Sequence, residues 1–351
     1  MAVAENIPRE NLQARAAGNH KKYKTMNLTK LHSNQRLLVE ELMNRGIKVE
    51  MVDPEIELLK VIWQDRSEYL LDRFNSVAPH NLVKLSADKY LTKKLLSENG
   101  LNVAQGELFY GNQFEKAETY AKSMGFPVVI KPNWGSHGDC VYSNIHSSDT
   151  LEEYIRDFVK KNDTDSPFLL ERQFIGKEYR IFITSRGDFA VLHRDPAHVV
   201  GDGQHTILEL VTITSAKRTN RQNNSLCPIV LDKTSEDYLV MTNRRLTDIP
   251  ANNEKVYLRS TSNIAKGGVS SDATDIVHPS VIDKAKQALG VFSGLPCVGI
   301  DLMTTDITKK QTKDNYVVLE VNSNPGLAMH MFPGIGKSRN VAKYLADVLF
   351  P

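Results

Sequence analysis

The chain has 351 residues, of which 41% are hydrophobic and 25% are charged, and its formal net charge is only +2. This length is too great for one simple core, so we expect two or three subdomains. The near-neutral charge gives no argument for a nucleic-acid partner. No apolar run reaches the ~20 residues that a membrane-spanning helix needs, and the polar residues 1–24 lack the apolar segment of a secretory signal.

The three cysteines, Cys140, Cys227 and Cys297, lie far apart and form no C-x-x-C pair. This spacing favours a reducing compartment and argues against a zinc site or a disulfide framework. We therefore expect a cytoplasmic protein with no membrane or nucleic-acid partner, and we leave open whether it forms a homodimer.

The first third of the chain predicts alternating helices and strands. Three helices are expected, over 33–46, 86–100 and 112–125. The first has Ser33 as its cap and Gly46 as its stop, and residues 47–53 predict the strand that follows. On the second helix, Lys89 and Lys93 lie one turn apart and share a face.

A lysine stands at the mouth of a glycine-bearing loop in the middle of the chain. Residues 128–130 predict a buried strand that continues into Lys131, and a strand resumes over 140–145. Gly135 and Gly138 lie in the loop between the two strands. A cation beside flexible backbone N–H groups suits a polyphosphate, although an ordinary hairpin ended by Lys-Pro would show the same pattern.

The later part of the chain is less regular. Residues 167–184 predict two strands that turn at Gly176. Residues 194–211 are rich in turn formers, and residues 216–255 are polar and weakly patterned. Residues 278–294 predict a strongly amphipathic helix.

Near the C-terminus, two strands are expected over 297–305 and 315–323, joined by a charged linker. This arrangement is typical of an antiparallel hairpin with an exposed loop. The second strand is unusual because Glu320 and Asn322 interrupt its apolar run, which then ends in Asn-Pro-Gly.

The polar residues of these two strands share a face. Because side chains alternate along a strand, Asp301 lies on the face of Gly299, and Glu320 and Asn322 lie on the face of Val318. If the strands pair, the two carboxylates and the amide converge beside the small Gly299. These are hard oxygen ligands, suited to Mg²⁺ or Mn²⁺ that also holds phosphates. The alternative is a polar surface on a half-exposed sheet.

Seven segments occur in an order that resembles the ATP-grasp ligases over roughly residues 80–351. They are SADKYLTKKLL, FPVVIKP, LLERQFIGKEYRIFI, RDPAHVVGDGQHTILELV, LRSTSNIAKGGVSSDATD, VGIDL and LEVNSNPG. The chain is most similar to the glutathione-synthetase-like module of bifunctional glutathione synthases and to the ligase half of cyanophycin synthetase.

The resemblance implies an α/β (α+β) protein with the ATP-grasp fold in three subdomains. We expect an N-terminal α/β subdomain over 1–85, a central lid subdomain over 86–184, and a C-terminal subdomain over 185–351 with the metal and substrate site. The nucleotide is expected between the lid and the C-terminal subdomain.

The resemblance also assigns nucleotide contacts. Lys89 and Lys131 match the two lysines that grip the phosphates, and Glu178 matches the acid that binds the ribose hydroxyls. The loop that covers the phosphates includes Gly135, Ser136 and Gly138. The hinge whose residues meet adenine comprises Glu171, Gln173, Phe174 and Ile175.

In the same way, Asp301, Glu320 and Asn322 match the ligands of magnesium, with two ions expected. Arg259 and Arg194 match basic positions near the γ-phosphate and the acyl group. For both arginines, a surface role in a loop is the alternative.

The implied activity is an ATP-dependent carboxylate–amine ligase that forms an amide bond through an acyl phosphate and releases ADP and phosphate. We expect small-molecule carboxylate and amine substrates, such as amino acids or a short γ-glutamyl peptide. D-alanine–D-alanine ligases have an arginine two residues before the metal aspartate, where this chain has Gly299. We expect a stand-alone module, so neither glutathione nor cyanophycin is assumed as product. A stand-alone glutathione synthetase, a nucleotide-binding regulatory protein without turnover, and a kinase stay open.

Overall fold

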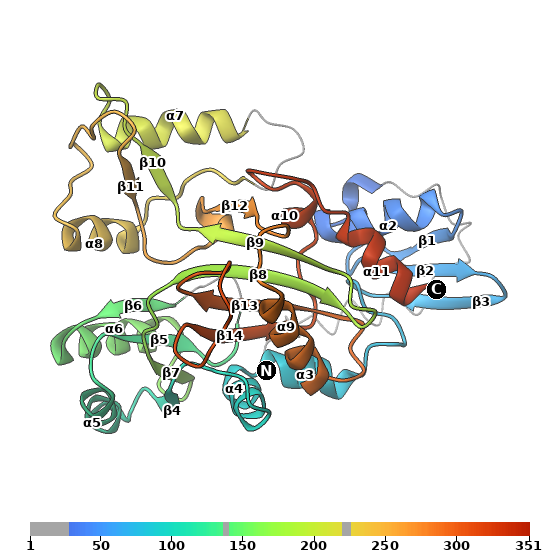
Figure 1. Cartoon of the computed structure of the whole chain (residues 1–351), viewed down its shortest axis with the longest axis horizontal. Helices are drawn as coiled ribbons and strands as arrows, with labels where there is room; N and C mark the ends of the chain where they lie inside the picture. The colour runs from blue at the N-terminus through green and yellow to red at the C-terminus, as the bar shows by residue number, and fades with distance from the viewer. Residues whose placement is uncertain (1–27, 136–139, 220–225) are drawn as a thin grey trace.

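The computed structural model describes residues 28–135, 140–219 and 226–351, so Ser136 and Gly138 lie outside the described residues. Within these ranges the chain forms four antiparallel sheets with helices packed on them (Figure 1). The α/β (α+β) class expected from the sequence is confirmed. No described helix is both long enough and apolar enough to cross a membrane.

A five-stranded sheet occupies the centre of the molecule, in the order β12-β9-β8-β13-β14 (Figure 1). Its strands are β8 (Lys177–Thr184), β9 (Phe189–Asp195), β12 (Val269–Asp272), β13 (Cys297–Thr304) and β14 (Tyr316–Asn322). One face packs on α3 (His80–Ala87), α4 (Lys89–Glu98) and α9 (Pro279–Val291). The helix predicted over 278–294 is confirmed. The helix predicted over 86–100 is present as α4 but begins only at Lys89, because Asp88 and not Ser86 is its N-cap and accepts from the backbone N–H of Leu91. The apolar sides of both helices fill the core under this sheet.

The other face of this sheet shares a core with the two ends of the described chain. This core joins α10 (Ala328–Met331) and α11 (Val341–Leu349) to the N-terminal unit. That unit comprises a 3₁₀ turn (Leu28–Lys30), α2 (Ser33–Asn44), β1 (Lys48–Asp53), β2 (Leu58–Trp63) and β3 (Arg66–Leu70). The predicted helix and strand are present, but His32 rather than Ser33 is the N-cap, because its side chain accepts from the backbone N–H of Asn34.

A separate four-stranded sheet lies in the region that the sequence predicts as the lid and is called the lid sheet, in the order β4-β7-β5-β6 (Figure 1). Its strands are β4 (Gly106–Tyr110), β5 (Val128–Pro132), β6 (Tyr142–Ile145) and β7 (Pro167–Arg172), covered by α5 (Phe114–Met124) and α6 (Ser148–Lys161). The predicted strands on either side of the glycine-bearing loop are present, and they pair with each other.

The chain leaves the lid after β7 and enters the central sheet at β8. These two strands do not pair, because β7 lies between β4 and β5 whereas β8 lies between β9 and β13. Residues 173–176 therefore form a hinge between two sheets. The change of core falls at this hinge and not at the expected boundary of 184/185. The apolar side of α4 joins the core under the central sheet, although its polar side chains also contact the strands of the lid.

A fourth, small unit stands above the lid. It contains β10 (His198–Val200), α7 (Ile207–Thr219), α8 (Lys233–Met241) and β11 (Lys255–Tyr257), with a core of its own. The sequence indicated only turns and weak patterning here. The sequence did not predict α7, because its apolar residues are spread around the helix and do not recur at the helical spacing that marks one apolar face.

The predicted hairpin of β13 and β14 is present, with a bulge in it. Asp301 pairs with Glu320, but the next residue, Leu302, pairs with Val318. Leu319 is therefore an extra residue on β14, which reverses the alternation of side chains at that point.

The bulge corrects one detail of the prediction. Val318 does not share a face with Glu320 and Asn322, because Val318 and Val321 both enter the core under the central sheet. Glu320 and Asn322 then lie on the opposite face.

Candidate active site

The hairpin brings the three predicted metal ligands together. Asp301 is directly opposite Glu320, and Gly299 is directly opposite Asn322. The Nδ2 of Asn322 donates to Oε1 of Glu320 at 3.0 Å. The side chain of Asp301 is almost fully buried, whereas that of Glu320 is 28% exposed and reaches the open side of the site.

Asp301 is held by two arginines from neighbouring strands. Arg180 on β8 contacts Oδ1 through Nε and donates to Oδ2 through Nη2 at 2.8 Å. Arg194 on β9 donates to Oδ2 through Nη1 at 3.0 Å. Burial alone would raise the pKa of Asp301, but the two guanidinium groups outweigh it and hold that pKa well below its usual range.

Arg180 was missed by the sequence prediction. Its guanidinium covers Gly299, where a Cβ would lie 3.3 Å from Nη1 of Arg180. Gly299 thus leaves room for an arginine that comes from β8 instead of from β13. The available signal was a charged residue within the apolar run of the strand 177–184, two residues after Glu178 and so on its face.

Glu178 belongs to the same group of charges. Its Oε1 lies 2.9 Å from Nη1 of Arg194, and its Oε2 accepts from the hydroxyl of Ser262. Burial raises the pKa of Glu178, while Arg194 opposes that rise. Arg194 therefore contacts both Glu178 and Asp301, so two further residues predicted for the site, Glu178 and Arg194, lie beside the metal ligand Asp301.

The predicted phosphate-binding lysines come from two elements, Lys89 from α4 and Lys131 from β5. Lys89, at the start of α4, donates to the carbonyl oxygen of Gly135 at 2.7 Å. Burial lowers the pKa of Lys89, and the charge of Glu320 opposes this. The ammonium of Lys89 thus lies within electrostatic reach of a predicted metal ligand.

Lys131 and Glu171 form a buried ion pair. The Nζ of Lys131 lies 2.9 Å from Oε2 of Glu171, whose side chain is 4% exposed. Glu171 was predicted at the adenine hinge. In the structure its carboxylate points at lysines, so its contact with a base stays a prediction.

The rest of the hinge is anchored on one side and exposed on the other. Gln173 exchanges two hydrogen bonds with Asn144 of β6, at 2.6 and 2.7 Å. Ile175 is 77% exposed, while Phe174 is half-buried. Gly176 lies so close to the carbonyl oxygen of Thr304 that a Cβ would approach within 2.7 Å. The hinge therefore presents an apolar side chain beside a rigid turn.

Arg259 does not join the cluster of Asp301. It is 2% exposed, and its Nη2 donates to the carbonyl oxygen of Val230 at 2.7 Å and to Oγ of Ser235 at 2.9 Å. Asp232, the N-cap of α8, lies 3.3 Å from the same nitrogen. These contacts make Arg259 an anchor for the start of α8. Its predicted catalytic role is not tested by them and stays a prediction.

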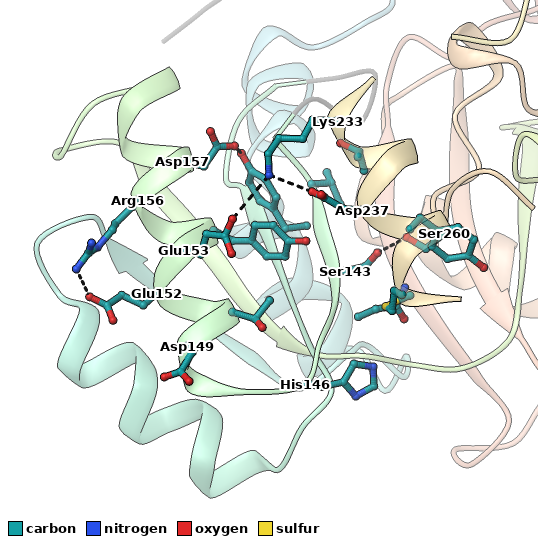
Figure 2. A pocket seen from close by; sticks show the side chains of 18 of the residues that line it. Ser143, His146, Asp149, Glu152, Glu153, Arg156, Asp157, Lys233, Asp237 and Ser260 are labelled. Carbon is teal, nitrogen blue, oxygen red and sulfur yellow. Dashed lines mark hydrogen bonds and ion pairs between the residues drawn. The ribbon is translucent and has the colours of Figure 1, made fainter. Parts of the chain in front are cut away.

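A cleft of about 1100 Å³ lies between the lid and the unit of α7 and α8 (Figure 2). Helix α6 forms one wall and α8 the other, and Lys233 reaches across to Glu153 at 3.7 Å. At its inner end, the hydroxyl oxygens of Ser143 and Ser260 are 2.6 Å apart. None of the predicted site residues that the structure describes lines it. It is linked to the cluster through residues 260–262, since Ser262 contacts Glu178.

The donor chemistry of the cluster fits a hard divalent cation. Asp301, Glu320 and Asn322 offer carboxylate and amide oxygens from one sheet face, the ligand set that Mg²⁺ and Mn²⁺ take. Within the described residues, no group of three His, Cys, Asp or Glu side chains is placed to hold a metal by itself. The amide oxygen of Asn322 is thus needed for a third ligand from this hairpin.

A family model and several known proteins are similar to this chain. Residues 88–179 match the family model described as "Carbamoyl-phosphate synthase L chain, ATP binding domain". Cyanophycin synthetase from Crocosphaera subtropica is 36% identical over 293 residues, which cover 83% of this chain and 33% of that protein. The glutathione biosynthesis bifunctional protein GshAB from Enterococcus faecalis is 30% identical over 341 residues, covering 94% of this chain and 44% of that protein.

A solved structure is similar over most of the fold. The crystal structure of a bifunctional glutathione synthetase from Pasteurella multocida matches with a TM-score of 0.65 and 29% identity, covering 91% of this chain and 44% of that one. The fold is therefore the ATP-grasp fold. Over the region that it shares with these relatives, the chain has the fold of the ATP-grasp ligases. The chain spans less than half the length of these relatives, so the similarity does not carry the activity of the whole relatives over to this chain.

Proposed function

We propose that the chain is an ATP-dependent ligase that joins a carboxylate to an amine through an acyl phosphate and releases ADP and phosphate. The observation that carries the proposal is the approach of two opposed sets of charge. Asp301 and Glu320 lie on the central sheet, and Lys89 of α4, which donates to the loop that contains Gly135, is near enough for the charge of Glu320 to act on its pKa. A nucleoside triphosphate needs both sets, cations for its phosphates and oxygen ligands for its metal.

In this proposal Asp301, Glu320 and Asn322 hold magnesium or manganese, with two ions expected. The bound metal would neutralise charge on the phosphates and so favour attack on phosphorus. Both carboxylate oxygens of Asp301 contact arginines, so a metal ion that binds here has to share these oxygens with Arg180 and Arg194.

The nucleotide is proposed to lie between the lid sheet and the central sheet. Lys89 and Lys131 hold its phosphates, and Glu178 accepts hydrogen bonds from the ribose hydroxyls. The exposed side chain of Ile175 gives the base an apolar surface at the hinge. Closure of the glycine-bearing loop would keep water away from the acyl phosphate.

The reaction needs no protein nucleophile. An oxygen of the substrate carboxylate attacks the γ-phosphorus and ADP leaves, and the amine then attacks the acyl carbon and phosphate leaves with loss of one amine proton. Arg194 and Arg180 are suited to the oxygens that carry charge in these steps, because a guanidinium donates two parallel hydrogen bonds.

We assign the cleft of Figure 2 to one of the two organic substrates. Its inner end at Ser260 is two residues from Ser262, which contacts Glu178. A substrate in the cleft can therefore present one end to the reacting centre. The volume suits a short peptide as well as an amino acid.

The substrates are best sought by phosphate release. All pairs of amino acids and short γ-glutamyl peptides are incubated with Mg-ATP, and phosphate, ADP and the joined product are measured. ADP release that requires an added amine supports the ligase. ADP release without an amine would indicate a kinase, and nucleotide binding without ADP release would indicate a regulatory protein. Glycine with γ-glutamylcysteine tests a glutathione synthetase, the alternative that the likeness to GshAB favours.

A further inference from the structure

A buried carboxylate at the end of β7 is shared by two lysines. The Oε2 of Glu171 lies 2.9 Å from Nζ of Lys131, and its Oε1 contacts Nζ of Lys93. Lys131 comes from β5 in the lid, whereas Lys93 comes from α4, which packs on the central sheet. Roles have been assigned above to Lys131 and Glu171, but none to Lys93.

The two lysines are held differently. The ammonium of Lys93 has a second acceptor, the carbonyl oxygen of Ala104 at 2.8 Å. Within the described part of the chain, Glu171 is the acceptor that holds Lys131. Lys93 is thus held by a hydrogen bond and an ion pair, whereas Lys131 is held by one ion pair and can exchange Glu171 for another partner.

The charges explain why two lysines are useful. Burial alone would raise the pKa of Glu171, but Lys131 and Lys93 outweigh it, so the carboxyl is ionised. A buried charge that loses its partner carries a large free-energy cost. If Lys131 were the one lysine paired with Glu171, a phosphate that drew it away would leave the carboxylate unpaired, and that cost would oppose binding of the nucleotide. With Lys93 in place, Glu171 keeps a cation when Lys131 leaves.

We propose that Lys93 is a positioning residue for nucleotide phosphates: it stays paired with Glu171 and so lets Lys131 leave that carboxylate for a phosphate. This inference rests on the proposed function, because it requires the nucleotide to bind at Lys131. It predicts an effect on the phosphates of the ligand and none on its base.

The test compares ADP with adenosine by calorimetry. The ratio of the dissociation constant of adenosine to that of ADP measures what the phosphates add to binding. In Lys93→Met this ratio should fall about tenfold, or ~1.4 kcal/mol. Lys94 is exposed on the same helix, so Lys94→Met removes the same charge and should leave the ratio within twofold of wild type.

A second variant separates positioning from structure. Lys93→Met/Glu171→Gln removes the carboxylate that would hold Lys131, so the ratio should return to within about threefold of wild type. If Lys93→Met does not fold, as judged by circular dichroism, Lys93→Gln replaces it, since its amide can still donate to Ala104.

The outcomes are distinguishable. An unchanged ratio in the single variant overturns the inference, and so does a fall that the double variant does not reverse, which would indicate a structural role. If wild type binds neither ADP nor adenosine, the proposed nucleotide site itself is wrong. Binding of ADP by wild type with an unaffected ratio in Lys93→Met overturns only the role of Lys93.

Discussion

The guanidinium of Arg180 grips both carboxylate oxygens of Asp301, with Nη2 2.8 Å from Oδ2 and Nε in contact with Oδ1. The two residues are directly opposite each other on β8 and β13, so the sheet register itself fixes the pair. Such a bidentate contact orients the carboxylate and keeps it ionised. Asp301 can therefore serve as a metal ligand only in the orientation that Arg180 sets.

Arg180→Lys should show this dependence. Lysine keeps the charge but offers no planar pair of donors, so Asp301 loses its orientation. We expect kcat for phosphate release to fall by ~10²-fold, the lower end of what one transition-state donor contributes. Arg186→Lys, on the exposed turn after β8, is the matched control and should be neutral. A fall of less than twofold in Arg180→Lys would remove Arg180 from the site.

Glu320→Gln tests the metal assignment. Its side chain is partly exposed and leaves the arginine contacts of Asp301 in place, so the fold should be kept. Turnover should be abolished, and the magnesium concentration that half-saturates any residual activity should rise, because a neutral amide is a weaker ligand. Asp301→Asn should also abolish turnover, but it leaves two buried guanidinium groups less well paired and so should destabilise the protein as well.

The control for this substitution is Asp314→Asn, in the exposed linker between β13 and β14. It removes one carboxylate near the same hairpin without touching the cluster. Wild-type kinetics and magnesium dependence in Glu320→Gln would rule out Glu320 as a ligand.

The structure separates the two arginines that the sequence placed together. Arg259 is buried against Val230 and Ser235, so Arg259→Lys should lose about 1–3 kcal/mol of unfolding free energy through unmet hydrogen bonds. Denaturant unfolding measures this loss, and calorimetry should find ADP affinity unchanged. If stability is unaffected and kcat still falls ~10²-fold, the catalytic role expected from the sequence is the better account.

The sequence predicted the parts of the site that depend on local pattern. Alternation along two strands sufficed to bring Asp301 to Glu320, because the connection over residues 305–315 is shorter than the crossover that parallel strands need and so favours an antiparallel pair. It could not show Arg180, since that contact requires β8 to lie beside β13, which are distant in the chain. The bulge at Leu319 was also out of reach, because one extra residue changes the register without a local signal in the strand.

Gly135 offers a test of the loop. The backbone φ of Gly135 is +119°, a conformation that residues other than glycine rarely adopt. Its carbonyl oxygen accepts a hydrogen bond from Nζ of Lys89. Gly135→Val should therefore displace Lys89 and weaken the binding of ADP by about tenfold, while the affinity for adenosine changes little. Gly46→Val, at another positive φ in the N-terminal unit, is the control for strain and should not affect ADP. Equal weakening in both variants would point to general destabilisation.

A buried histidine should make stability depend on pH. His330 is fully buried under the central sheet, and neither ring nitrogen has a hydrogen-bond partner in the described structure. Burial, aided by the charge of Arg180 and opposed by that of Asp272, lowers its pKa to about 3. The unfolded value is about 6.5, so the folded state binds fewer protons than the unfolded state below that pH.

The stabilisation from neutral His330 is therefore fully present above about pH 6.5 and is lost as the pH falls toward 3, by about 1.4 kcal/mol per unit. Urea unfolding between pH 6.5 and 5 measures how steeply the free energy of unfolding changes with pH, in wild type and in His330→Leu. The leucine fills a similar volume beside Phe182 with a side chain that cannot bind a proton. Other histidines titrate in both proteins, so the difference between the slopes isolates His330. We expect the slope of the variant to be smaller by about 1 kcal/mol per pH unit or more. Equal slopes would mean that the folded protein accommodates a charged imidazole at this position, and that the burial of His330 is relieved when it binds a proton.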